Sequence, residues 1–165
     1  MNFNGLNGGK MECNEQIKMS GLIRVIKQNV ITGVRTIQIF HNLVCTSGKV
    51  AIARRLMNSA TQSNEGMITY GATGTGNTAP SASDTTLTTE LARKVIATAF
   101  FTSNVVTLRV FFNTTSSNGN IKEFGLFGES ATGSANTGTM FNHALISVTK
   151  TSAETLTIEA ELSIA

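Results

Sequence analysis

Charged side chains are scarce in this 165-residue chain. Asp, Glu, Lys and Arg make up 14% of it, against about 25% in an average globular protein. Thr, Asn, Gly and Ser fill the difference, and this polar, uncharged mixture is typical of β-strands and their turns rather than of helical surfaces. It also suits a chain that hides surface against other subunits, where buried charge is costly, although a compositional habit of the source would give the same pattern.

Cysteine and long apolar runs are scarce too. The two cysteines, Cys13 and Cys45, form neither a CxxC motif nor a metal site. We expect Cys45, which lies in an apolar stretch, to be a buried thiol. The N-terminus lacks the apolar run of a signal peptide, and no stretch approaches the ~20 apolar residues of a membrane span. We therefore expect a soluble chain that is made in a cytoplasm.

The residues that usually carry catalysis are few and scattered. The chain has two histidines, His41 and His143, and one aspartate, Asp84, so a Ser-His-Asp triad would need nearly all of them. Each histidine lies within a strand pattern and is expected to be structural, and too few ligands lie near one another for zinc. Glu159 and Glu161 adjoin on one wet strand face, whereas glycosidase carboxylates straddle a cleft. The sequence predicts no catalytic, cofactor-binding or metal-binding residue and no enzymatic activity.

A glycine cluster is the nearest approach to a phosphate-binding loop. Gly71, Gly74 and Gly76 are followed by Asn-Thr-Ala-Pro, which does not start the helix that such a loop needs. There is also no Gly-Lys-Ser/Thr sequence. We interpret the cluster as a strand-to-loop turn.

Three residues in strand patterns predict contacts. Gly125 interrupts an apolar strand, which favours close packing there by the helix or by another chain. Phe111 and Phe127 are predicted to lie on outer faces and are candidates for a subunit interface.

Alternating hydrophobicity sets the fold class. Between Glu154 and Ile164, apolar residues (Leu156, Ile158, Ala160, Leu162, Ile164) alternate with polar ones (Thr155, Thr157, Glu159, Glu161, Ser163). Side chains on a strand change face at every residue, so this pattern predicts an antiparallel strand with one packed and one solvated face.

The remaining elements follow the same reasoning. A helix is predicted over 48–58, begun by Thr46 and Ser47 and packing through a stripe of Val50, Ala53 and Met57, with Ile52 and Leu56 beside it. Residues 1–20 are expected to form an extended arm and residues 21–165 one domain. Residues 84–90 are read as one helical turn or an extended connector. Strands are predicted over 22–27, 34–44, 67–70, 94–102, 105–112, 121–127, 140–148 and 154–164. We predict a mainly β chain, an antiparallel β-sandwich of jelly-roll type with one helix.

The charge is unevenly distributed. Residues 1–60 hold eight Lys or Arg and two Glu, a net +6, whereas residues 61–165 hold five Lys or Arg and eight Asp or Glu, a net −3. These halves could complement each other between neighbours in an assembly, or the basic residues are simply solvated. The basic residues are scattered and follow no nucleic-acid motif, which argues against nucleic acid as a partner.

Blocks of sequence in a fixed order carry a resemblance. They are Thr32-Gly33-Val34, His41-Asn42-Leu43-Val44, Ser47-Gly48 and Ile52-Ala53-Arg54-Arg55-Leu56; Ile68-Thr69-Tyr70, Gly74-Thr75-Gly76-Asn77-Thr78-Ala79-Pro80, Asp84-Thr85-Thr86-Leu87 and Thr89-Glu90-Leu91-Ala92-Arg93-Lys94; Asn118-Gly119-Asn120-Ile121-Lys122-Glu123-Phe124-Gly125-Leu126-Phe127; and Gly138-Thr139-Met140-Phe141, Val148-Thr149-Lys150-Thr151 and Glu154-Thr155-Leu156-Thr157-Ile158. Over residues 31–164, this order resembles small structural proteins of tailed bacteriophages and prophages, described as tail, tail-fibre, baseplate or other virion components.

The resemblance implies a role without catalytic residues. It implies a non-enzymatic virion component, made in the host cytoplasm, that assembles as a homo-oligomer with other virion proteins in the tail, baseplate or fibre-attachment region. Two alternatives stay open: a capsid-decoration or head-fibre protein, and a module that binds host surface glycans through polar loops. The chain has no Trp and one Tyr, Tyr70, which weighs against the glycan alternative.

Overall fold

The computed structural model describes residues 17–56 and 66–165. These residues form eight strands and one helix. In chain order the elements are β1 (Met19–Asn29), β2 (Arg35–Val44), α1 (Thr46–Leu56), β3 (Ile68–Gly74), β4 (Glu90–Thr102), β5 (Val105–Phe112), β6 (Gly119–Gly128), β7 (Thr139–Lys150) and β8 (Glu154–Ile164). The mainly β character and the single short helix among the described residues agree with the sequence analysis.

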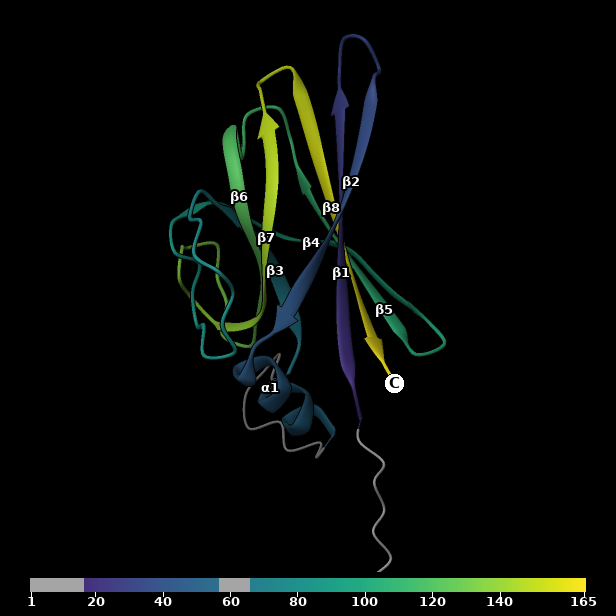
Figure 1. Cartoon of the computed structure of the whole chain (residues 1–165), viewed down its shortest axis with the longest axis vertical. Helices are drawn as coiled ribbons and strands as arrows, with labels where there is room; N and C mark the ends of the chain where they lie inside the picture. Colours follow the sequence, from purple (N-terminus) through teal and green to yellow (C-terminus); the bar gives the residue numbers. More distant parts are fainter. Residues whose placement is uncertain (1–16, 57–65) are drawn as a thin grey trace, which may run out of the picture.

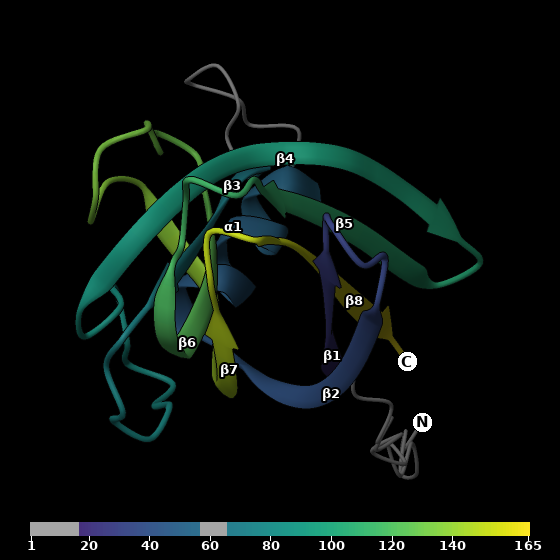
Figure 2. The same cartoon turned by 90° about the horizontal axis from the view of Figure 1, so that it is seen from above.

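The predicted sandwich is wrong, because the strands close into a barrel. Its eight antiparallel strands run in the order β1-β2-β7-β6-β3-β4-β5-β8, and Figure 2 shows them as a ring. Two strands turn the corners between its halves. β2 pairs with β1 over 35–42 and with β7 at 43–44, while β4 pairs with β3 over 90–95 and with β5 over 96–102. A register shift between Ile96 and Thr98 marks the corner in β4, as expected of a bulge that bends a strand.

The core fills the barrel with the residues that alternation predicted. In β8, Leu156, Ile158, Ala160 and Leu162 are buried, whereas Ile164 at the strand end is exposed. They pack in one hydrophobic cluster with side chains from each of the seven other strands. Full burial of each large apolar side chain contributes about 1.5–3 kcal/mol, so this cluster is the main source of stability.

Helix α1 lies at one end of the barrel (Figure 1). It begins at Thr46, two residues before the predicted start, and it is described as far as Leu56. The predicted packing stripe is wrong, because the buried residues are Gly48 and Ala51, while Val50 and Ala53 are exposed and Met57 lies outside the described residues. Of the two residues predicted beside the stripe, Ile52 packs against the core, whereas Leu56 is exposed. Small residues let the helix approach closely: a Cβ on Gly48 would overlap the backbone of Phe141 in β7.

The ends of the domain meet at the helix end of the barrel. Strand β1 begins at Met19, so it includes the last residues of the predicted arm, whose residues 1–16 lie outside the described part. The pairing of β1 with β8 continues to Lys18, whose N–H donates to the carbonyl of Ala165. Lys18 and Ala165 therefore lie side by side.

Candidate functional site

A buried carboxylate organises the connector between β3 and β4, residues 75–89. Glu123 of β6 is fully buried. Its carboxylate accepts hydrogen bonds from the backbone N–H groups of Gly76 (2.9 Å), Thr88 (2.9 Å) and Thr89 (2.8 Å). A buried charge is tolerated when it is hydrogen-bonded in this way, so Glu123 fixes both ends of the connector.

A histidine joins the same cluster. His143 of β7 is buried, with its Nδ1 2.7 Å from Asp84 Oδ2 and its Nε2 3.2 Å from Glu123 Oε2. The structure thus brings together His143 and Asp84, two of the residues that the sequence singled out. His41 is exposed on β2 and takes no part. Residues 84–90 form the extended connector rather than a helical turn.

Sequence reasoning assigned no site and no structural role to Glu123. A signal for it existed. Glu123 stands two residues after Ile121 on the same strand, so both side chains point to the same, buried face, whereas Lys122 between them is exposed. A carboxylate at an inward strand position needs internal donors, and the neighbouring connector supplies them.

The pKa shifts of Asp84 and Cys45 favour a structural role for these residues. Burial would raise the pKa of Asp84, but the hydrogen bonds from His143 and from the N–H of Ser81, with attraction to His143, lower that pKa below its ordinary value. Burial, and secondarily the charge of Asp84, raises the pKa of the Cys45 thiol to about 11. Cys45 is buried as predicted and stays a thiol at neutral pH, which makes it a poor nucleophile. Among residues 17–56 and 66–165, no three His, Cys, Asp or Glu side chains could hold a metal ion together.

The glycine cluster makes room for this arrangement. Gly74 is still within β3, and a Cβ on Gly74 or Gly76 would meet the side chain of Glu123. A Cβ on Gly71 would meet Val110 in the core. The glycines therefore permit close packing over a carboxylate.

The outer face of β8 is less solvated than predicted. Glu159 is 9% exposed at its side chain and lies between Arg109 (2.7 Å) and Arg24 (3.1 Å). Glu161 contacts Arg24 at 3.4 Å. The reason is position: β8 pairs with β1 and β5 and is not an edge strand, so cations from both neighbours flank its carboxylates.

The two predicted interface phenylalanines differ. Phe111 is exposed as predicted, but Phe127 is fully buried, with the guanidinium carbon of Arg93 4.1 Å from its ring centroid. Arg93 is itself held by Glu90 at 2.8 Å. Gly125 is indeed closely packed, although by Met140 and Leu87 rather than by the helix: a Cβ there would lie 2.8 Å from Met140 Cε.

The β1–β2 hairpin, residues 19–44, carries the densest group of exposed apolar side chains in the described chain. Five lie within ten positions, and Ile31 at the turn is 83% exposed. They are Val30, Ile31, Val34, Ile37 and Ile39. Figure 1 shows the hairpin projecting away from β6 and β7. Over residues 35–42, β2 pairs with β1 on one edge and with no described strand on the other, and only Leu43 and Val44 pair with β7. The main-chain groups on the other edge of 35–42 are therefore available to a partner.

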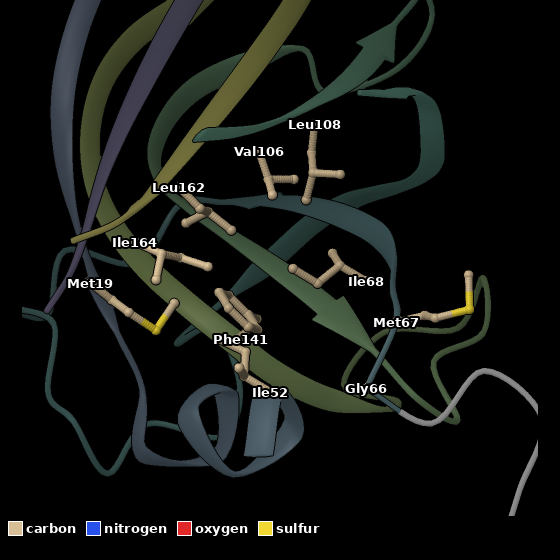
Figure 3. Close-up of a pocket in the computed structure, with 10 residues that line it drawn as sticks. All are labelled: Met19, Ile52, Gly66, Met67, Ile68, Val106, Leu108, Phe141, Leu162 and Ile164. Atoms are coloured by element: carbon tan, nitrogen blue, oxygen red, sulfur yellow. The ribbon is translucent and has the colours of Figure 1, made fainter. Parts of the chain in front are cut away.

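An apolar pocket of about 250 Å³ opens at the helix end of the barrel. Figure 3 shows Met19, Ile52, Phe141 and Leu162 among the side chains around it. No charged side chain of the described residues lines it. Small-molecule sites usually add a few placed polar groups, so this pocket suits an apolar side chain better than a polar substrate.

Comparison of the chain with protein-family models, with curated proteins and with solved structures finds no match. The resemblance to phage structural proteins therefore stays a prediction. In the described ranges, no helix combines the length and the apolar character needed to cross a bilayer.

Proposed function

We propose that this chain is a non-enzymatic structural protein of a tailed-bacteriophage virion that assembles as a homo-oligomer in the tail, baseplate or fibre-attachment region. The observation that carries the proposal is the β1–β2 hairpin, with its exposed apolar side chains and one unpaired edge. Soluble monomers usually protect such an edge with charged residues, proline or a bulge. Over residues 35–42, where β2 pairs regularly with β1, Arg35 at the start of the strand is the one such feature.

The buried cluster supports the same role. Glu123, His143 and Asp84 direct their polar atoms at the connector and at one another. They stabilise a long loop over a rigid barrel, as an assembly subunit requires. The position in the particle rests on the sequence resemblance, and capsid decoration or a head fibre is the alternative position.

Two measurements test this proposal. Sedimentation of the purified full-length chain should show a defined oligomer, and Ile37→Lys/Ile39→Lys should shift it towards monomer, whereas the matched control Thr85→Lys/Thr86→Lys on the exposed connector should not. Immunogold labelling and mass spectrometry should find the chain in purified particles. A monomer that is absent from particles would refute the proposal.

Exposed phenylalanines favour glycan binding as a second candidate. Phe100 and Phe101 on β4 and Phe111 on β5 are exposed, and the Arg109 guanidinium carbon lies 5.2 Å from the Phe100 ring centroid. Aromatic faces beside a hydrogen-bond donor can stack on sugars. A glycan array that shows ligands for the unaltered chain, and none for Phe100→Ala/Phe111→Ala, would support this candidate, and an array without ligands would remove it.

A further inference from the structure

The charged side chains of the described residues are arranged asymmetrically. All seven acidic side chains are engaged: Asp84, Glu90, Glu123, Glu129, Glu154, Glu159 and Glu161 each contact a cationic or histidine side chain. The same residues include twelve Lys and Arg, which against seven acids gives a net charge of +5. Unneutralised charge on the described surface is therefore positive, and an acidic partner complements it.

Two of these cations border an apolar groove. The groove, of about 640 Å³, lies between α1 and the start of β1. Its charged lining residues are Lys18 and Lys49, neither of which has a carboxylate within ion-pair distance among the described residues. Ile17 and Leu56, also in its lining, are 77% and 78% exposed. We name this site the basic groove. It shares Met19 and Ile52 with the pocket of Figure 3.

We propose that the basic groove of one copy binds residues 11–16 of a second copy. That segment, Met-Glu-Cys-Asn-Glu-Gln, carries the chain's only acidic residues before position 60, Glu12 and Glu15, together with apolar Met11. Two carboxylates match two lysines, and a methionine side chain suits the neighbouring apolar pocket because it is flexible and unbranched.

The site of chain exit favours a second copy over the same chain. Lys18 and Ala165 exchange backbone hydrogen bonds, so strand pairing of β1 with β8 reaches Lys18 beside the groove. Residues 11–16 directly precede Ile17, which itself lines the groove, so they could enter the groove of their own chain only through a tight reversal directly before Ile17. At about 3.3–3.6 Å per residue, the five residues from Ile17 back to Glu12 can span at most roughly 18 Å, and this length is enough to reach a neighbour.

Charge reversal in full-length chains tests this contact, which rests on the proposed homo-oligomer. Lys18→Glu/Lys49→Glu should weaken self-association at least about tenfold at low salt, and Glu12→Lys/Glu15→Lys should do the same, because each turns attraction into repulsion. A matched control with the same change of charge on the barrel wall, Lys94→Glu/Lys122→Glu, should change it less than about twofold.

Mixing the two altered chains gives the decisive result. The acidic segment of the groove variant then meets the basic groove of the segment variant, and the basic segment of the segment variant meets the acidic groove of the groove variant. The mixture should therefore recover the association that each altered chain alone has lost. No recovery in the mixture would overturn binding by a second copy, as would unchanged association of either altered chain alone. If instead the unaltered chain is a monomer at all concentrations, the proposed homo-oligomer fails and this contact fails with it.

Discussion

The sharpest test of the buried cluster is Glu123→Gln. The substitution keeps the size and shape of the side chain but removes its charge. Oε1 of Glu123 accepts the N–H groups of Gly76 and Thr89, and Oε2 accepts that of Thr88 at 2.9 Å. Glutamine best keeps its oxygen at the Oε1 position, where it serves two donors. Its amide nitrogen then faces the N–H of Thr88, donor against donor, and the carboxylate charge 3.2 Å from His143 Nε2 is lost.

The expected loss follows from these contacts. One charge-assisted hydrogen bond disappears, at about 1.5–3 kcal/mol, and the N–H of Thr88 loses its partner, at about 1–3 kcal/mol. Because Thr88 is near the surface, water recovers part of this loss. We expect the free energy of unfolding to fall by about 2–4 kcal/mol, with a melting temperature lower by roughly 5–15 °C.

Chemical denaturation and native-state hydrogen exchange measure this effect. The amides of Gly76, Thr88 and Thr89 should lose protection in the variant. Glu161→Gln is the control, because its side chain is 30% exposed and contacts Arg24 at 3.4 Å, so its loss should be below about 1 kcal/mol. Equal losses in the two variants, or unchanged protection of the three amides, would refute the argument that Glu123 holds the connector.

Three further predictions address the helix, the thiol and the pH dependence of stability. Gly48→Ala should destabilise the fold by about 1–3 kcal/mol in urea denaturation, because the added Cβ overlaps the Phe141 backbone; an unchanged midpoint would contradict the close helix packing. In a Cys13→Ser chain, Cys45 should resist iodoacetamide at pH 8 while folded and react once unfolded, because burial raises its pKa to about 11; rapid labelling of the folded chain would show an accessible thiolate. The pKa of Asp84 is lowered from 3.8 in the folded state, so its ionised form stabilises folding above that value, and this contribution is lost as the pH falls through the folded pKa. Denaturation between about pH 5 and pH 2 should therefore show a steeper loss of stability for the unaltered chain than for Asp84→Asn, and parallel curves would argue against this linkage.

The strands show how far local pattern carries a prediction. The predicted ranges of β5 and β8 coincide with the observed ones, because alternation and a clear turn at each end are both local signals. The helix was also found, but its buried face was not. Close approach through Gly48 and Ala51 depends on where β7 lies, and helical spacing of large apolar residues does not contain that information.

The candidate site was only half visible in the sequence. Asp84 and His143 were recognised as unusual residue types, yet 58 residues lie between them, and nothing local indicates that their side chains are 2.7 Å apart. Glu123 became significant only when the connector was placed over it. The burial of Glu159 likewise depends on Arg24 and Arg109 from two neighbouring strands.

By itself the sequence determined which segments are strands and which side of each strand is apolar, because side-chain direction along an extended chain alternates whatever lies beside it. Tertiary structure alone decided that the sheet closes. Closure depends on β2 and β4 each bending to pair with two partners, and a residue's hydropathy does not say which strand lies at its edge. The same non-local pairing left one edge of β2 without a described partner over residues 35–42 and set Lys18 and Lys49 around one groove.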